Sequence, residues 1–118
     1  MTEIWPTELR VKDKGAHLSI LFESGESYLL AAELLRVESP SAEVKGHGPG
    51  QEQLVFGKRR VTIIKAEPIG SYAVRLVFSD GHSTGLYTWD YLAKLGRNQT
   101  DIWQTYEAKL ISEGKFRD

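Results

Sequence analysis

Apolar and polar residues alternate along two stretches of the chain, residues 17–23 and 72–79, and a glycine turn follows each. A period of two residues is typical of a β-strand with one buried face. The turn dipeptides are Ser24-Gly25 and Asp80-Gly81, and short apolar stretches at residues 27–30 and 84–88 follow them. The pattern therefore predicts two antiparallel hairpins in which each glycine has a positive φ. The expected inward-facing side chains are Leu18, Ile20, Phe22, Val74, Leu76 and Phe78.

Helical patterns follow both hairpins. Residues 31–37 are rich in good helix formers, and residues 89–95 continue the second hairpin as a helix that we expect to end at Gly96. A separate C-terminal helix is expected at about residues 100–113, because Asp101 and Gln104 have the spacing of a capping box. One face of that helix would pack on the core. Its members are Ile102, Trp103, Tyr106 and Leu110.

The two hairpin-helix stretches resemble each other at a constant offset of 56 residues. Four positions are identical, and they are Phe22 and Phe78, Gly25 and Gly81, Ser27 and Ser83, and Leu30 and Leu86. Either an ancient duplication or the general likeness of hairpin-helix units explains this. In both cases the expected fold is α+β, an antiparallel sheet built of two hairpin-helix units plus a C-terminal helix. We expect one domain over residues 1–118 with its core at about residues 9–95.

The remaining segments give weaker signals. Residues 9–11, 53–56 and 61–66 are short strand candidates, and residues 67–70 contain a proline and a glycine that break the chain. Residues 39–51 hold two prolines and three glycines and are expected to form a loop.

Composition narrows the function classes. The chain has 118 residues, is 41% hydrophobic and 26% charged, and carries a formal net charge of −1. These values are typical of one globular domain and give no general attraction to nucleic acid or to an anionic membrane. We therefore expect neither as a partner. There is no cysteine, which excludes disulfides and thiolate metal sites and is compatible with the cytoplasmic location that we expect.

Candidate chemistry centres on histidines. His47 and Gly48 lie in the glycine-rich loop just before Gln51, and His82 follows the second hairpin turn. A metal site would need His82 together with His47 or Asp80. No Ser-His-Asp set and no facial triad of an iron oxygenase is recognisable. Trp89 belongs to an aromatic run that either packs the core or marks an interface.

Two stretches together resemble a known family. Residues 35–44 (LRVESPSAEV) and 80–92 (DGHSTGLYTWDYL) are similar to segments of the gamma-butyrobetaine hydroxylase N-terminal-like domain, in its short bacterial stand-alone form. In the full-length oxygenases this domain precedes an iron- and 2-oxoglutarate-dependent catalytic domain, for which 118 residues leave no room. The resemblance implies a zinc site whose three cysteine positions fall on Ser39, Ser41 and Val44 and whose histidine is His82. Because hydroxyls are poor zinc ligands and valine is none, we expect that zinc site to be absent.

These observations favour a non-catalytic accessory module that binds another protein. The expected interaction residues are His47, Gly48, Gln51 and Trp89, and no cofactor is expected. The alternative is a protein that binds iron or another metal through His82, associated with oxidoreductase or iron–sulfur assembly function. This alternative fits the resemblance, because similar domains accompany P-loop iron–sulfur cluster carriers. A small enzyme that works through the His47 loop is a third hypothesis.

Overall fold

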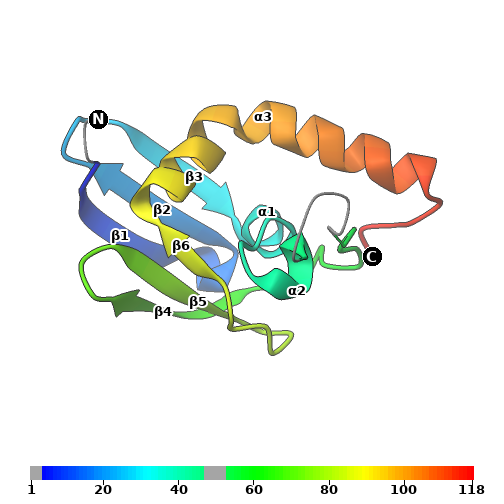
Figure 1. Cartoon of the computed structure of the whole chain (residues 1–118), viewed down its shortest axis with the longest axis horizontal. Coiled ribbons are helices and arrows are strands. Elements are labelled where there is room, and N and C mark those ends of the chain that lie inside the picture. The colour runs from blue at the N-terminus through cyan, green and yellow to red at the C-terminus, as the bar shows by residue number, and fades with distance from the viewer. Residues whose placement is uncertain (1–3, 47–52) are drawn as a thin grey trace.

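A computed structural model describes residues 4–46 and 53–118 of the chain. Three antiparallel strands and a helix form the first half (Figure 1), namely β1 (Pro6–Lys12), β2 (His17–Phe22), β3 (Ser27–Ala31) and α1 (Ala32–Val37). Three more strands and a long helix form the second half, namely β4 (Ile63–Ile69), β5 (Ala73–Phe78), β6 (Leu86–Thr88) and α3 (Trp89–Ser112). A 3-10 turn (Asp13–Gly15) follows β1, and α2 (Ala42–Lys45) lies between α1 and β4. The predicted α+β class is confirmed.

The two hairpin-helix units have the same construction. β2 and β5 span positions that differ by 56 residues at both ends. Gly25 and Gly81 have φ values of 94° and 92°, as the turn dipeptides predict. In each turn the amide of a phenylalanine, Phe22 or Phe78, donates to a carbonyl four residues later, at 2.8 and 2.9 Å. A glycine tolerates this positive φ without a steric penalty, so both turns form from the same local sequence.

The strands divide into two three-stranded sheets, β1-β2-β3 and β4-β5-β6, which share one hydrophobic core. The central strand of each sheet supplies the largest part of it, because the alternation places every second side chain on the inner face. The predicted inward-facing residues of β2 and β5 are all at most 1% exposed. Tyr87 on β6 joins them with no exposed surface.

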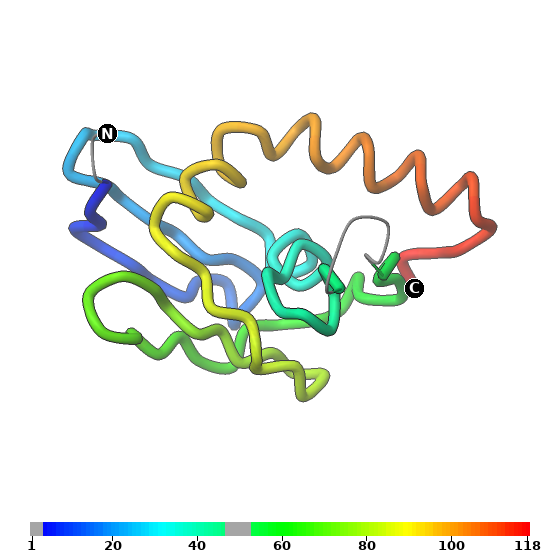
Figure 2. The backbone as a smooth tube through the Cα atoms, in the orientation of Figure 1, coloured from blue at the N-terminus to red at the C-terminus, as the bar shows by residue number. Residues whose placement is uncertain are grey.

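The second unit ends in one continuous helix, so the prediction of two helices separated at Gly96 is wrong. α3 runs from Trp89 to Ser112, and its backbone changes direction between the yellow and orange stretches of Figure 2. Gly96 lies inside the helix because Tyr28 of β3 packs directly on it. A Cβ atom at Gly96 would lie 2.6 and 2.7 Å from the two Cδ atoms of the Tyr28 ring. The glycine permits close packing and does not stop the helix.

Three local predictions also differ from the structure. Residues 53–56 form no strand, and the loop predicted at residues 39–51 contains the short helix α2. β4 continues through Pro68, where a chain break was predicted. β4 pairs only with β5, so it is an edge strand that tolerates the missing amide of a proline.

The second half of α3 packs as its periodicity predicts. Tyr106 and Leu110 are 5% and 4% exposed and cluster with Val37 of α1, while Ile102 and Trp103 pack partly buried against the main core. After α3 the chain turns back toward the segment that follows residue 55 (Figure 1). In the described ranges, no helix is both long and apolar enough to cross a lipid bilayer.

Candidate functional site

Ser39, Ser41 and His82, which the resemblance selects, lie together in the structure. Ser39 and Ser41 follow α1, and His82 follows the turn between β5 and β6. The Nε2 atom of His82 lies 2.8 Å from Ser39 Oγ and 3.4 Å from Ser41 Oγ, and the two hydroxyl oxygens are 3.3 Å apart. All three residues are buried. The cluster therefore connects the end of the first unit to the hairpin of the second.

The other ring nitrogen of His82 faces a carboxylate. His82 Nδ1 lies 3.3 Å from Oε2 of Glu43 on α2, and the Thr84 hydroxyl donates to Oε1 of the same carboxylate at 3.1 Å. Ser39, His82 and Glu43 thus have the order of a serine–histidine–carboxylate triad. Ser39 has no exposed surface, however, so a substrate cannot reach its hydroxyl. The arrangement holds three segments together and offers no accessible nucleophile.

A charged group supports the hairpin on which His82 lies. Asp80 Oδ1 accepts from the His82 amide at 3.1 Å, and Oδ2 lies 2.7 Å from both Arg36 Nε and Lys58 Nζ. Burial pushes the pKa of Asp80 upward, but the hydrogen bonds from Lys58, the His82 amide and Arg36 outweigh it and hold that pKa at about 2. Asp80 therefore holds the hairpin tip against α1, and its carboxylate is already satisfied by cations of the chain.

The pKa of His82 lies below its ordinary value of 6.5. Burial is the main cause, and the positive charge of Arg36 adds to it, while the carboxylates of Glu43 and Asp80 act in the opposite direction. The neutral imidazole is therefore favoured at neutral pH. A neutral ring can accept from one hydroxyl at Nε2 and donate to Glu43 at Nδ1.

A corresponding contact joins the units in the reverse direction. Ser41 of the first unit contacts His82 of the second, and the positions displaced by 56 residues, Arg97 and Glu26, also form a pair. Arg97 Nε and NH2 donate to the two carboxylate oxygens of Glu26 at 2.9 and 2.8 Å. The Arg97 hydrogen bond is the main reason that the pKa of Glu26 falls to about 2. Each unit thus contacts the hairpin of the other through an equivalent position.

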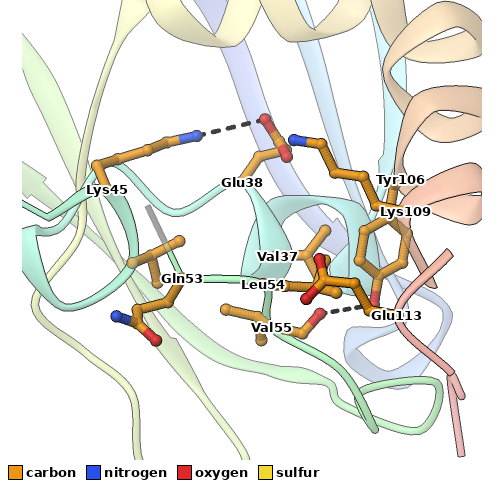
Figure 3. A pocket seen from close by; sticks show the side chains of 10 residues that line it. Val37, Glu38, Lys45, Gln53, Leu54, Val55, Tyr106, Lys109 and Glu113 are labelled. Atoms are coloured by element: carbon orange, nitrogen blue, oxygen red, sulfur yellow. Dashed lines mark hydrogen bonds and ion pairs between the residues drawn. The ribbon is translucent and has the colours of Figure 1, made fainter. Parts of the chain in front are cut away.

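A hollow of about 620 Å³ lies beside this cluster, between α1, α2, residues 53–55 and α3 (Figure 3). Apolar side chains form its floor, and charged side chains project along its rim. Tyr106 closes one side by donating its hydroxyl to the Val55 carbonyl at 2.8 Å, and Lys45 pairs with Glu38 at 3.4 Å. The lining residues are Val37, Glu38, Val44, Lys45, Gln53, Leu54, Val55, Tyr106, Lys109 and Glu113.

The predicted interaction loop borders this hollow. His47, Gly48 and Gln51 lie outside the described residues. The amide of Gln53 donates to the carbonyl of Val44 at 2.7 Å, so the segments that lead into and out of the loop meet at the wall of the hollow. The loop therefore begins and ends at the hollow.

Trp89 occupies a different surface. Its Nε1 donates to the Ser71 carbonyl at 2.8 Å, and its ring lines a cleft of about 220 Å³ with Trp5, Tyr72 and three other residues. Its neighbours in the aromatic run pack inward. Tyr87 is fully buried, and the hydroxyl of the half-buried Tyr91 donates to the Glu38 carbonyl. Trp89 is thus separate from the loop with which the sequence analysis grouped it.

Residues 9–93 match the family model described as gamma-butyrobetaine hydroxylase-like, N-terminal. The chain belongs to this family. Two NMR solution structures of members with similar length agree with it over almost the whole chain. One is 44% identical with a TM-score of 0.83 and covers 97% of this chain and 90% of its own. The other is 47% identical with a TM-score of 0.84 and covers 98% and 86%.

A crystal structure from Acidithiobacillus ferrooxidans is also similar, and it belongs to a protein of unknown function in the DUF971 family. It is 38% identical, has a TM-score of 0.65, and covers 77% of this chain and 91% of its own. No curated protein matches the chain. The similar structures thus share the small fold, and the one whose printed description mentions function gives it as unknown.

The cluster has the geometry of the family's zinc site but not its donor atoms. A zinc ion that joins a thiolate and an imidazole at ordinary bond lengths holds the two donor atoms about 3.5 Å apart. Ser39 Oγ and Ser41 Oγ lie at a similar distance from His82 Nε2, so the positions are suitable. The donors are unsuitable, because hydroxyls bind zinc poorly and the fourth position is the aliphatic Val44. Within residues 4–46 and 53–118, no three His, Asp or Glu side chains are placed to hold a metal ion.

Proposed function

We propose that the chain is a non-catalytic accessory module that binds a segment of another protein in the hollow between α1, α2 and α3. The observation that supports this most directly is the composition of the hollow. Val37, Val44, Leu54 and Val55 provide an apolar floor, and charges of both signs surround it. An apolar centre with a polar rim is the usual organisation of a protein-binding surface.

The size and position of the hollow agree with a peptide-sized occupant. A volume of about 620 Å³ lies within the range of pockets that enclose small ligands or a few side chains. Glu38, Lys45, Lys109 and Glu113 balance in charge, which favours a partner segment whose apolar side chains are flanked by both acidic and basic residues. The loop that begins after Gly46 borders the same hollow, so a partner would contact both.

The metal-binding alternative requires ligands in addition to His82. In the described part of the chain the two ring nitrogens of His82 face Ser39 and Glu43, and both carboxylate oxygens of Asp80 have partners within the chain. The metal content of protein purified without chelators tests this alternative. Stoichiometric iron that is lost in His82→Ala would support it.

Site-specific photocrosslinking in the native cell tests the proposed function. A photoreactive residue at Gln53, at the edge of the hollow, should crosslink to a defined partner, while the same residue at Arg10 on β1 should not. Inverting the rim with Lys109→Glu and Glu113→Lys keeps the net charge and should abolish the Gln53 crosslink. Both positions are exposed, so the fold should persist. Equal crosslinking at Gln53 and Arg10, or a crosslink indifferent to the inverted rim, would contradict the proposal.

A further inference from the structure

The last four residues of the chain, which we call the tail (Lys115 to Asp118), return to the body of the domain. The amide of Gly57 donates to the Phe116 carbonyl and the amide of Arg59 donates to the Arg117 carbonyl, both at 3.0 Å. Figure 1 shows the tail, in red, beside the green segment that contains Gly57. The tail therefore pairs with the chain as an added extended segment does.

The tail places one side chain in a specific site. Arg117 Nε and NH2 donate to the two carboxylate oxygens of Glu33 at 3.0 and 2.7 Å. The guanidinium also lies over the Trp103 ring, 5.1 Å from its centroid. A bidentate ion pair combined with stacking on an indole is the arrangement by which proteins recognise arginine rather than lysine.

The receiving side of this contact is rigid. Glu33 is on α1 and is only 6% exposed, and Trp103 of α3 packs against the main core. They line a pocket of about 300 Å³ together with Ala31, Leu34, Gln99 and Arg117 itself. A carboxylate buried to this degree is costly without a cation, so the position of Glu33 calls for one.

The arginine that fills this site is held weakly. Phe116 is 74% exposed, and the side chains of Asp118 and Arg59, which pair at 3.2 Å, are 66% and 49% exposed. Chain ends held by a few exposed contacts open at low free-energy cost. The tail can therefore leave while the site on α1 and α3 stays formed.

We propose that Glu33 and Trp103 form an arginine-recognition site that the chain's own tail occupies, and that an arginine in an extended segment of a partner protein displaces the tail. The tail is then a tethered competitor that weakens binding of any such segment. This site is separate from the hollow, so the inference would stand if the hollow bound nothing. It extends the proposed function by naming a second contact and the chemistry that fits it.

A peptide with the sequence of the tail tests the inference. Acetyl-Lys-Phe-Arg-Asp carrying a fluorophore should bind the full-length Arg117→Ala variant saturably, and the wild type about tenfold or more weakly, because the tethered tail competes. Arg10→Ala, which removes a distant exposed arginine, should behave as the wild type. Adding Glu33→Gln to Arg117→Ala should abolish binding. The peptide with lysine in place of arginine should bind less well, because lysine lacks the planar fork.

A second measurement on the unmodified chain removes dependence on the variant's folding. The side-chain Nε–H resonance of Arg117 should move to the position of a solvated arginine when excess unlabelled peptide displaces the tail. The inference is overturned if that resonance stays unchanged at saturating peptide. It is equally overturned if folded Arg117→Ala binds no peptide, or binds it equally well after Glu33→Gln.

Discussion

Gly85 is the residue whose replacement tests the geometry of the Ser39–His82 cluster most sharply. It is buried just before β6, and its φ is not in the left-handed region. A Cβ atom there would overlap Ser39 Oγ, and it would lie 3.2 Å from Pro40 Cδ and 3.3 Å from Tyr87 Cε1. In Gly85→Ala the new methyl group must therefore push Ser39 away from His82.

Two opposing effects set the magnitude. Replacing glycine by alanine at a compatible backbone position stabilises a protein by about 0.4–1 kcal/mol through the unfolded chain. An added methyl group in a packed interior costs about 1–3 kcal/mol, and weakening the Ser39–His82 hydrogen bond adds about 0.5–1.5 kcal/mol. We therefore expect a net loss of about 1–3 kcal/mol in the free energy of unfolding. For a domain of this size that corresponds to a fall in Tm of about 4–12 °C.

Urea denaturation followed by tryptophan fluorescence measures the change. The Ser39→Ala background provides the control, because it removes the hydroxyl that the methyl group meets. The cost of Gly85→Ala should fall by about 1 kcal/mol there, with a remainder from Pro40 and Tyr87. If Gly85→Ala stabilises the protein, or costs the same in both backgrounds, the close approach of Gly85 to Ser39 is wrong.

Three further predictions concern the same regions. Because the pKa of His82 is lower in the folded than in the unfolded chain, stability should be complete above about pH 6.5 and fall below it by up to about 1.4 kcal/mol per pH unit; the fall should be shallower in His82→Gln, and equal slopes would contradict it. Gly96→Ala should destabilise the domain by about 1 kcal/mol or more, against the usual gain in a helix, with rescue by Tyr28→Leu; a higher Tm would refute the packing contact. A triple cysteine variant should hold one zinc ion per chain after dialysis and lose it with His82→Ala, and a metal-free variant would refute the vestigial geometry; its positions are Ser39, Ser41 and Val44.

The sequence predicted the hairpins because their determinants are local. Alternation along β2 and β5 fixes the buried face, and a glycine at the turn permits the positive φ. Gly96 shows the limit of this reasoning. A glycine near a helix end usually marks a stop, and only the position of Tyr28, 68 residues earlier in the chain, shows that it permits close packing.

The candidate site was predictable in part for a similar reason. Three of its members came from a resemblance in sequence, but Glu43 carries no local signal that it will face His82 across 39 residues. The hollow combines side chains from α1, residues 53–55 and α3, each of which looks like ordinary core or surface in isolation. The pair of Arg117 and Glu33, 84 residues apart, is equally invisible until the tail folds back.

Calorimetry with the purified partner that Gln53 captures tests the central claim most directly. Leu54→Asp places an unpaired charge on the apolar floor of the hollow and should weaken binding by about tenfold or more, since burying such a charge costs over 1.4 kcal/mol. Arg10→Ala should leave the affinity unchanged, and circular dichroism should show both variants folded. An affinity equal to the wild type in folded Leu54→Asp would contradict the claim that this hollow is where the domain binds its partner.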